Sequence, residues 1–390
     1  MLNKKKRKIC VVINSRPNYS RIKSFLIEAK KSKYIDLNIL VGASALLYRF
    51  GEVIKEIKKD GFKVSQTVHT IVEGENPTTM AKSTGLGIIE LSTHFQNIKP
   101  DIVLTIADRF ETIATAIAAS YMNIPVAHTQ GGEMTGSIDE NVRHAVTKLS
   151  HIHFPSTKKA KKNILKMGEN PSKVFLTGCP SVDLIKYMDL SIDKKVNTTI
   201  KGVGDDIDLN KEFLILLQHP VTTEYGNGFK QISNTLEGIS KLKDKIQVLG
   251  MWPNPDAGSD DISKGIRILR EKDNDIKMRF VRNFSPENFL RILNQSSCII
   301  GNSSAGIREC SFLGVPSVNI GTRQNFRERG PNVVDVSHNS DEIFKAINFQ
   351  RKKKYKKSNL YGNGDAGKKM VKILTKVDLS IKKRLFSYSK

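Results

Sequence analysis

The sequence predicts an α/β protein with two domains, each built around a parallel sheet. Short apolar runs that suit buried strands alternate with longer amphipathic segments that suit helices, and this alternation is typical of parallel sheets. The chain has 390 residues, more than one hydrophobic core usually organises. A polar, basic stretch at 191–211 interrupts the alternation. We therefore place one domain at 1–190, a second at 191–365, and a C-terminal helix with a basic tail at 366–390.

The first domain shows the alternation from its beginning. The run KICVVIN at 8–14 suits a strand, and the helix expected at 20–32 carries Ile22, Phe25 and Leu26 on one face. The further strands are expected at 37–43, 101–107, 124–130, 151–154 and 174–178. The further helices are expected at 50–59, 80–97, 111–122 and 138–149.

The second domain restarts the pattern after the polar stretch. Its strands are expected at 213–218, 246–251, 278–281 and 297–301. The segment 307–313 suits a helix after the last of these strands, and the lysine-rich end of the chain is expected to be helical at 365–377. No internal repeat and no low-complexity tract appear in the sequence.

The composition favours a cytoplasmic protein without a metal site. No apolar run reaches the roughly 20 residues that span a bilayer. The basic start MLNKKKRK is followed by an apolar run that is too short for a signal peptide. The spacing of Cys10, Cys179, Cys298 and Cys310 fits neither a disulfide framework nor a set of metal ligands, so we expect reduced, buried thiols. We expect no metal and no membrane insertion.

The net charge of +24 raises the alternative of a protein that binds polyanions without catalysis. The lysines are spread along the chain, with local clusters only at 4–8 and 351–357, and no basic segment is interleaved with aromatic residues. We therefore expect a solvated basic surface that attracts anionic substrates, and no specific nucleic-acid partner.

The stretch 301–330 carries the strongest single signal. A strand end is followed by the small residues GNSSAG, and such a turn before a helix presents free N–H groups to an anion. The hydroxyls of Ser303 and Ser304 add donors, and Arg323 follows with a charged donor. Glu309 lies in the first helical turns, where it suits a sugar hydroxyl. The alternative is a serine-rich helix cap followed by an ordinary strand.

Polar residues follow the expected strands, where ligands of α/β proteins bind. Each has an ordinary alternative when taken alone: a surface cation, a helix cap, a tight turn, or a carboxylate that stabilises a helix dipole. Two sheets that face each other would bring these residues together, so the predicted site lies between the domains. The candidates are Arg16, Asp108, Arg109, Gln130, Glu133, Asp139, His219, Asn254, Ser303 and Ser304.

Taken together, the motifs resemble a known family. They are RPNYS at 16–20, TTMAKSTGL at 78–86, DRFET at 108–112, HTQGGEMTGSIDENVRHAVTKLSHIHF at 128–154, GCPS at 178–181, PNPDAG at 253–258, GNSSAGIRE at 301–309 and GTRQNFRERG at 321–330. The sequence is similar to the hydrolysing UDP-N-acetylglucosamine 2-epimerases, the sialic-acid-pathway branch of the nucleotide-sugar 2-epimerases. The resemblance extends from about residue 8 to residue 370.

The resemblance implies two Rossmann-like domains in the glycosyltransferase-B arrangement, with a C-terminal helix that crosses back towards the first domain. A nucleotide sugar would be held mainly by the second domain, and no cofactor would be needed. A homo-oligomer, a dimer or a tetramer, is expected. The implied binding residues are Arg16, Arg109, Asn254, Asp256, Gly258, Ser303, Ser304, Gly306, Glu309 and Arg323.

The implied reaction eliminates the nucleoside diphosphate across C1–C2 to give a 2-acetamidoglycal, to which water adds to release the free 2-epimer. Asp108, Gln130, Asp139 and His219 occupy the family's catalytic positions. Gln130 is a departure, because the family has a glutamate there and an amide cannot exchange a proton as an acid. Either Gln130 only forms hydrogen bonds, or Glu133 supplies the missing carboxylate.

Several alternatives stay open at this level. A glycosyltransferase, or an epimerase that returns the intact nucleotide sugar, would share the same fold. The sequence does not distinguish a uracil from a guanine nucleotide, N-acetylglucosamine from a 2,4-diacetamido-trideoxy sugar, or the base from the acid between Asp108 and Asp139.

Overall fold

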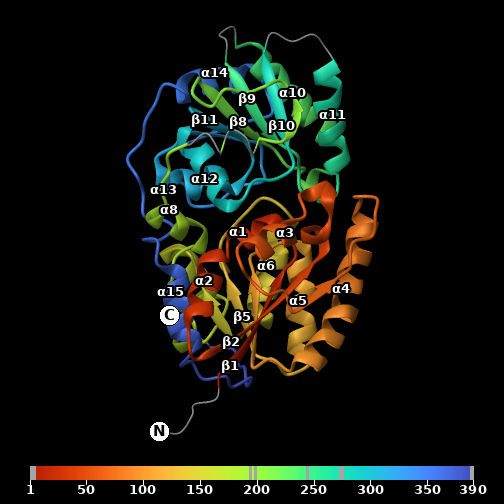
Figure 1. Ribbon diagram of the computed structural model, residues 1–390, viewed down its shortest axis with the longest axis vertical. Coiled ribbons are helices and arrows are strands. Elements are labelled where there is room, and N and C mark those ends of the chain that lie inside the picture. Colours follow the sequence, from red (N-terminus) through yellow and green to blue (C-terminus); the bar gives the residue numbers. More distant parts are fainter. Residues whose placement is uncertain (1–5, 193–195, 197–199, 243–245, 272–275, 387–390) are drawn as a thin grey trace.

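Two α/β lobes are stacked along the long axis of the molecule (Figure 1). The computed structural model describes residues 6–192, 196, 200–242, 246–271 and 276–386. The first lobe contains a 6-stranded sheet in the order β3-β2-β1-β4-β5-β6, and the second a 7-stranded sheet in the order β13-β12-β11-β8-β9-β10-β7. The paired strands are parallel except β10 and β7. The predicted α/β class is therefore confirmed.

The first sheet is covered by helices on both faces. Its strands are β1 (Arg7–Ile13), β2 (Ile35–Gly42), β3 (Gln66–Val68), β4 (Ile102–Ile106), β5 (Val126–Thr129) and β6 (Ile152–Phe154). The helices of this part of the chain are α1 (Arg16–Ser20), α2 (Lys23–Lys31), α3 (Val53–Lys59), α4 (Pro77–Ile98), α5 (Phe110–Tyr121), α6 (Ile138–Leu149), α7 (Lys158–Lys166) and α8 (Asp183–Tyr187). Side chains of α2 and α3 pack on one face of the sheet, and those of α4 and α5 pack on the other.

The second sheet is also buried on both faces. Its strands are β7 (Gly202–Gly204), β8 (Phe213–Leu217), β9 (Gln247–Met251), β10 (Lys277–Val281), β11 (Cys298–Gly301), β12 (Ser317–Ile320) and β13 (Val333–Val336). The helices are α10 (Gly228–Ser240), α11 (Ser259–Glu271), α12 (Pro286–Gln295), α13 (Glu309–Leu313), α14 (Ser340–Gln350) and α15 (Ala366–Leu374). Helices α10, α11 and α14 pack on one face, and α8, α12 and α13 on the other.

Besides the polar stretch at 191–211, two helical segments link the lobes, because each packs in the core of the lobe to which its chain neighbours do not belong. Val182 and Ile185, at the beginning of α8, pack in the core of the second lobe, so this core begins before the stretch we assigned to the linker. At the other end, Met370 and Leu374 of α15 pack in the core of the first lobe. The chain thus leaves the second lobe and returns to α2 at its end, as the blue helix beside α2 in Figure 1 shows.

Three predicted elements differ from the structure. The single helix at 20–32 is two helices, because α1 is a short turn started by Ser15 and Pro17, and the chain breaks at Arg21 and Ile22. The strand at 174–178 is wrong: only Val174 forms a bridge, and the chain then turns through Gly178, whose φ is +89°. The helix at 307–313 is shortened to the 5 residues of α13, preceded by a 3-10 turn.

Candidate active site between the two lobes

A cavity lies between the lobes, where the carboxyl ends of the two sheets face each other. The first lobe lines it with residues that follow β1 and β4, and the second lobe with residues that follow β8, β9, β11 and β12. The predicted residues that the structure brings together in its wall are Arg16, Asp108, Arg109, His219, Asn254, Ser303, Ser304, Glu309 and Arg323. The expected position of the site between two domains is thus where the structure has its interlobe cavity.

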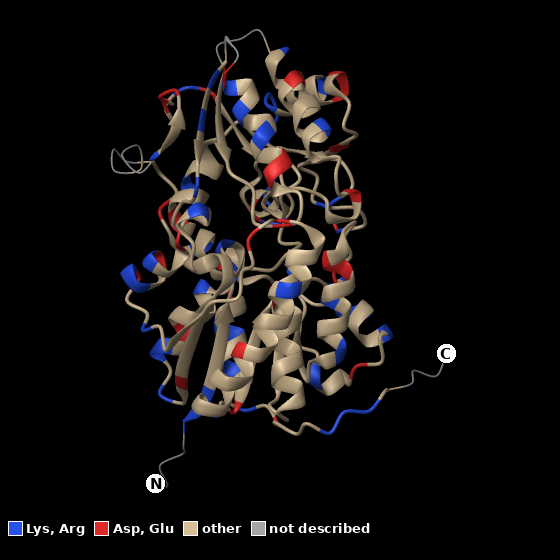
Figure 2. Cartoon of the chain, turned by 90° about the vertical axis from the view of Figure 1, so that its right-hand side faces the viewer, with Lys and Arg blue, Asp and Glu red and all other residues tan. Residues whose placement is uncertain are grey.

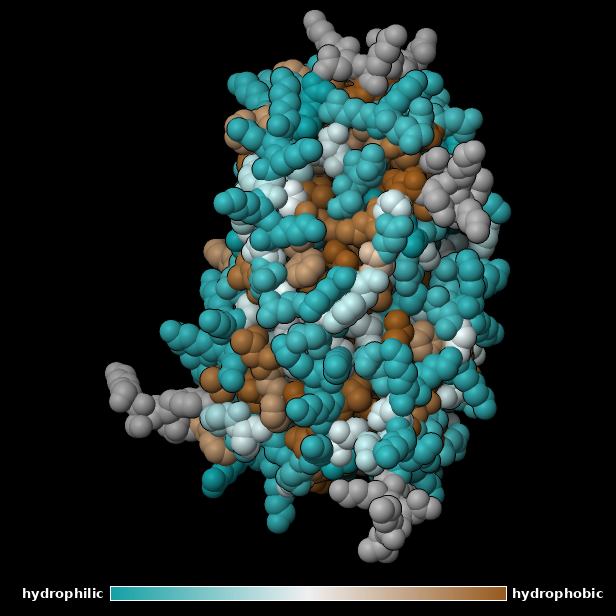
Figure 3. All heavy atoms as spheres, turned by 60° about the vertical axis from the view of Figure 1, so that its left-hand side comes forward, coloured by the Kyte–Doolittle hydropathy of each residue, from teal (hydrophilic) through white to brown (hydrophobic). Residues whose placement is uncertain are grey.

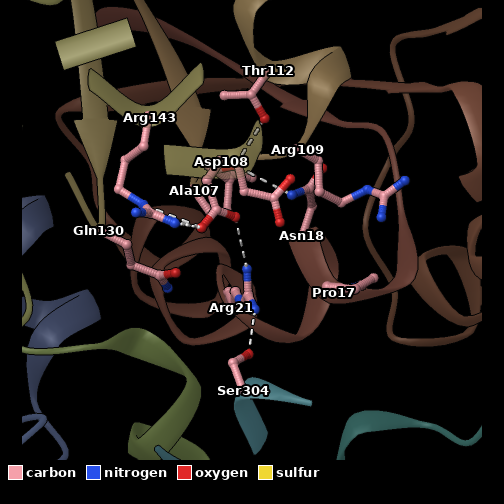
Figure 4. Close-up of polar contacts among 12 residues, drawn as sticks. Pro17, Asn18, Arg21, Ala107, Asp108, Arg109, Thr112, Gln130, Arg143 and Ser304 are labelled. Carbon is pink, nitrogen blue, oxygen red and sulfur yellow. Dashed lines mark hydrogen bonds and ion pairs between the residues drawn. The ribbon is translucent and has the colours of Figure 1, made fainter. Parts of the chain in front are cut away.

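Asp108 lies at the bottom of this cavity among arginines (Figure 4). It follows β4, and Arg143 of α6 donates to its Oδ2 from Nε at 3.2 Å and also from Nη2. Arg21 and Arg327 approach the same carboxylate at 3.7 and 3.6 Å. Burial alone would raise the pKa of Asp108, but the arginines, Arg143 first, hold it well below its ordinary value. Asp108 is therefore ionised.

Asp139 is a second carboxylate with the opposite pKa shift; it is not itself in the wall of the cavity but contacts the wall residue Arg323. It begins α6, where the Ser137 hydroxyl caps the helix, and it pairs with Arg323 at 3.4 Å. Its pKa is raised above the ordinary value, first by burial and then by the negative charge of Asp108. Two carboxyl groups whose pKa values are pushed apart are suited to the roles of base and acid.

His219 is held in one orientation by the backbone around it. It follows β8, and its N–H donates to Asn302 Oδ1 at 2.7 Å while Asn302 Nδ2 donates to its carbonyl at 2.8 Å. The N–H of Asn254 donates to Nδ1 at 3.3 Å, so Nδ1 is the acceptor and the proton of the neutral ring is on Nε2. Burial, followed by Arg323 and other arginines, lowers the pKa of His219 well below its ordinary value. His219 is thus a neutral donor.

Gln130 and Glu133 are not in the wall of the cavity. Gln130 ends β5 with a φ of +63°, is fully buried, and donates from Nε2 to Cys179 Sγ at 3.3 Å. Glu133 is buried between Arg308, at 2.5 Å, and Arg327, at 3.3 Å. Burial would raise the pKa of Glu133, but Arg308 and Arg327 lower it. Neither Gln130 nor Glu133 therefore lines the cavity, and both are buried behind the residues that do.

The predicted binding residues fall into two groups. In the wall, Arg16 of the first lobe donates to Asn254 Oδ1 of the second lobe at 3.1 Å, and Arg109 pairs with Asp256 at 2.8 Å. Glu309 is buried, and its Oε2 has no hydrogen-bond partner among the residues that the structure describes, so this atom is available to a ligand.

Asp256, Gly258 and Gly306 are outside the wall, so the structure does not bring them to the cavity directly. Asp256 acts through Arg109, as described above. A side chain at Gly258 would be strained, because its φ is +92°. A Cβ at Gly306 would lie 2.3 Å from Ser317 Oγ, so this glycine is required by packing.

Several functional side chains of the site escaped the sequence analysis. Arg143 and Arg308 are fully buried, and Arg21 spans the cavity from Asp108 to Ser304. Arginines in the segments 16–21, 139–144 and 301–309 look like surface residues in the sequence. What the sequence does show is that each of these arginines lies within or next to one of the family motifs quoted above.

The described part of the chain contains no group of three or more His, Cys, Asp or Glu residues arranged to hold a metal ion. It also contains no helix that is both long enough and apolar enough to cross a bilayer.

Comparison with known proteins identifies the family. The model of the UDP-N-acetylglucosamine 2-epimerases matches residues 27–375. The chain belongs to this family. Two relatives are the UDP-N,N'-diacetylbacillosamine 2-epimerase (hydrolyzing) of Legionella pneumophila, 33% identical over 96% of this chain and 97% of the relative, and the GDP/UDP-N,N'-diacetylbacillosamine 2-epimerase (hydrolyzing) of Campylobacter jejuni, 31% identical over 88% of each. The family predicted from the motifs is confirmed.

A solved structure of the 2-epimerase family confirms the fold. The crystal structure of Methanocaldococcus jannaschii UDP-GlcNAc 2-epimerase in complex with UDP-GlcNAc and UDP superposes with a TM-score of 0.78 at 21% identity, over 94% of this chain and 99% of that one. The two lobes are therefore the two Rossmann-like domains of a glycosyltransferase-B arrangement, with the cavity in the cleft between them.

Proposed function

We propose that this 2-epimerase is a hydrolysing enzyme that converts a UDP-linked 2-acetamido sugar to the free 2-epimer and UDP. The observation that carries the proposal is a set of three groups: Asp108, an ionised carboxylate in the wall of the cleft; His219, a neutral imidazole in the same wall that donates from Nε2; and Asp139, a carboxyl group with a raised pKa that contacts the wall residue Arg323. A base, an acid and a hydrogen-bond donor are what elimination followed by hydration requires.

The nucleotide would be held from the second domain. The hydroxyls of Ser303 and Ser304 and the guanidinium groups of Arg16, Arg109 and Arg323 would surround the diphosphate, and these are charge-assisted or short hydrogen bonds. The unpartnered Oε2 of Glu309 suits a ribose hydroxyl. Because α13 has only 5 residues, we assign the phosphates to these side chains and give little weight to a helix dipole.

Asp108 would accept the C2 proton, and the bond between C1 and the diphosphate oxygen would break to give the 2-acetamidoglycal. His219 Nε2–H and the arginines would stabilise the charge that develops on the leaving oxygen. Asp139, with its raised pKa, would return a proton to C2 as the oxygen of water bonds to C1. The proton that the water loses would restore Asp139, and Asp108 would pass its proton to the solvent. Gln130 and Glu133 would not exchange protons: Gln130 fixes the end of β5, and Glu133 neutralises two buried arginines.

The two relatives reported above favour one sugar. Both are named for N,N'-diacetylbacillosamine and both are named as hydrolysing. We therefore propose a UDP-linked 2,4-diacetamido sugar as the first substrate to test, with UDP-N-acetylglucosamine as the second and GDP-linked sugars as the third.

A proton NMR time course in D₂O with each nucleotide sugar tests the proposal. We expect UDP and a free 2-epimer that carries deuterium at C2, without any acceptor added. An intact nucleotide sugar with inverted C2 would instead identify a non-hydrolysing epimerase, and release of UDP only in the presence of an acceptor would identify a glycosyltransferase.

A further inference from the structure

Arg21 connects the two halves of the site. It lies at the break between α1 and α2, and its side chain is only 12% exposed. One end of the guanidinium, Nη2, donates to Ser304 Oγ of the second domain at 2.7 Å. The other end, Nη1, is 3.7 Å from Asp108 Oδ1. Figure 4 shows Arg21 between these two partners.

The two contacts are unequal. The 2.7 Å contact with Ser304 has the length of a good hydrogen bond, whereas 3.7 Å to Asp108 is an ion pair without one. The contact with Ser304 holds Arg21 at the place where we expect the diphosphate. A phosphate offers several charged oxygens to the planar guanidinium, so it is a stronger partner than a carboxylate that already has other cations.

Asp108 has those other cations on every side. Arg143 of α6 and Arg327 of the second domain contact its carboxylate, and Arg308 lies farther away. Two further titratable groups interact electrostatically with Asp108, namely Asp139 of α6 and His128 of β5. Asp108 can therefore lose Arg21 and still be an ion, but with one positive charge less beside it.

We infer that Arg21 couples the binding of the diphosphate to the basicity of Asp108. The substrate's phosphates draw the guanidinium away from the carboxylate, and Asp108 becomes a stronger base only when the leaving group is in place. This inference rests on the function proposed above. It addresses a difficulty of that function, because a carboxylate held by three arginines is a weak acceptor for a carbon-bound proton.

A calorimetric double-mutant cycle on the full chain tests the inference, with UDP and uridine as the two ligands. Arg21→Met should weaken the binding of UDP by about tenfold or more, the value of a charge-assisted hydrogen bond, and leave the affinity for uridine unchanged. Asp108→Asn should strengthen the binding of UDP, because Arg21 is then no longer attracted to residue 108. When Asp108→Asn is introduced into Arg21→Met, the factor by which it raises the UDP affinity should be at least about threefold smaller.

The pH dependence of turnover gives a second reading that leaves Asp108 in place. In the unmodified enzyme the acid limb of kcat, which reports the complex, should lie at higher pH than that of kcat/KM, which reports the free enzyme. Arg21→Met should move the limb of kcat/KM up towards that of kcat, since removal of a positive charge raises the pKa of Asp108. Arg21→Lys, which keeps the charge, should restore part of the difference.

Each of three outcomes would overturn the inference: equal effects of Asp108→Asn in both backgrounds, unchanged UDP affinity in Arg21→Met, or the same acid limb with and without Arg21. Melting curves identify a variant that does not fold: if it is Asp108→Asn, the pH profiles decide, and if it is Arg21→Met, Arg21→Ala takes its place in both tests. The failure of the proposed function looks different, because it appears in the unmodified enzyme as the wrong product or as absence of UDP binding.

Discussion

Asp108 and Asp139 show how residues of one chemical type acquire opposite properties within one cleft. Asp108 meets Arg143, Arg21 and Arg327, whereas Asp139 meets Arg323 and lies near the charge of Asp108. The excess of cations around the first lowers its pKa, and burial near an anion raises the pKa of the second. The assignment of base and acid, which the sequence left open, follows from this difference as a proposal.

The first prediction concerns these two carboxylates. Asp108→Asn and Asp139→Asn should each lower kcat by roughly 10²–10⁴-fold, the span for positioned acid–base groups, while UDP still binds. Since Asp139 must be protonated to act, activity should fall as the pH rises through its raised pKa, and Asp139→Asn should lack this alkaline limb. Steady-state kinetics between about pH 5 and pH 9 measure both the loss of kcat and the alkaline limb. Full activity of Asp108→Asn would remove the catalytic assignment altogether.

The second prediction separates Glu133 from catalysis. Glu133→Gln removes the carboxylate that pairs with Arg308 and leaves Arg327 with Asp108 alone, so we expect a lower melting temperature, bounded by the roughly 3–5 kcal/mol of a broken buried pair. Turnover at a temperature where the variant is folded should fall only slightly. A loss of turnover as deep as that of Asp139→Asn, without a change in melting temperature, would show that Glu133 replaces the missing carboxylate at Gln130.

At the scale of elements, the loop 131–137 between β5 and α6 joins the domains. Arg143 fixes it from inside, since its Nη1 donates to the Glu133 carbonyl at 2.6 Å and its Nη2 to Thr135 Oγ1 at 3.2 Å. On the other side, the N–H of Gly136 donates to the Arg323 carbonyl of the second domain at 3.2 Å. A Cβ at Gly136 would lie 2.0 Å from the carbonyl oxygen of Thr322.

The third prediction uses this close approach. Gly136→Val should keep the second domain from reaching the loop, and a displacement of about 1 Å is enough to lower kcat/KM by about 10²-fold. Gly85→Ala is the matched control, because a Cβ at this exposed position of α4 meets nothing within 4 Å. The control should be slightly more stable, as alanine is a better helix former than glycine, and fully active. Normal kinetics of Gly136→Val would exclude this contact from the catalytic state.

The fourth prediction concerns the tail after α15. Lys383 Nζ donates to the carbonyls of Lys148 and Ser150 at the end of α6, at 2.6 and 2.5 Å, and pairs with Glu169 at 2.7 Å. Burial would raise the pKa of Glu169, but His153, Lys148 and Lys383 lower it to about 2. The stability that this carboxylate contributes is therefore present above its ordinary pKa of about 4.5 and is lost as the pH falls towards 2.

Melting curves between pH 7 and pH 2.5, roughly the window given by those two pKa values, test this prediction. Lys383→Met should lower the melting temperature at pH 7 by several degrees. The difference between variant and unmodified protein should shrink as the pH falls, because the carboxylate partner is lost in both. A difference that is independent of pH would mean that the lysine acts only through the α6 carbonyls.

The same elements show what could be predicted from the sequence. Buried aliphatic strands such as β1 and β8 and the polar residues after them were predictable, because periodicity and strand ends are local features. The break that sends Arg21 into the cleft was not, since it depends on the caps at Ser15 and on a partner 283 positions away, Ser304. Nor was the end of the pairing after Thr177, whose N–H still donates to the Pro155 carbonyl, whereas the N–H of Cys179 donates to Tyr361.

At the scale of the whole molecule, the surface is basic without a single basic face. Lys and Arg are distributed over both domains and interspersed with Asp and Glu (Figure 2). The face in Figure 3 is mostly hydrophilic, with apolar patches between the hydrophilic side chains. Positive groups are concentrated around Asp108: Arg21 lines the cleft, and Arg143, Arg308 and Arg327 are buried behind its wall. This distribution favours an anionic substrate in the cleft over a polyanion on the surface.

The domains contact each other through several side chains around the cleft. Lys23 of α2 pairs with Glu287 of α12 at 2.6 Å, and Arg49 pairs with Asp260 of α11 at 2.5 Å. The contact of Arg49 is near the solvent and individually weak. Other pairs between the domains are buried, as those of Arg109 with Asp256 and of Arg308 with Glu133 are. A ligand that binds both domains adds to these contacts and should stabilise this arrangement further.

The last prediction follows from this balance. In solution without ligand, the two domains should open and close, and UDP should shift the population towards the closed form because it offers phosphates to Arg16 and Arg21 of one domain and to Ser304 of the other. Small-angle scattering should give a smaller radius of gyration with saturating UDP than without it. Uridine, which lacks the phosphates, should produce less closure, and Gly136→Val should close incompletely because its side chain meets Thr322. An unchanged profile with UDP, when calorimetry confirms binding, would mean that the nucleotide does not draw the two domains together.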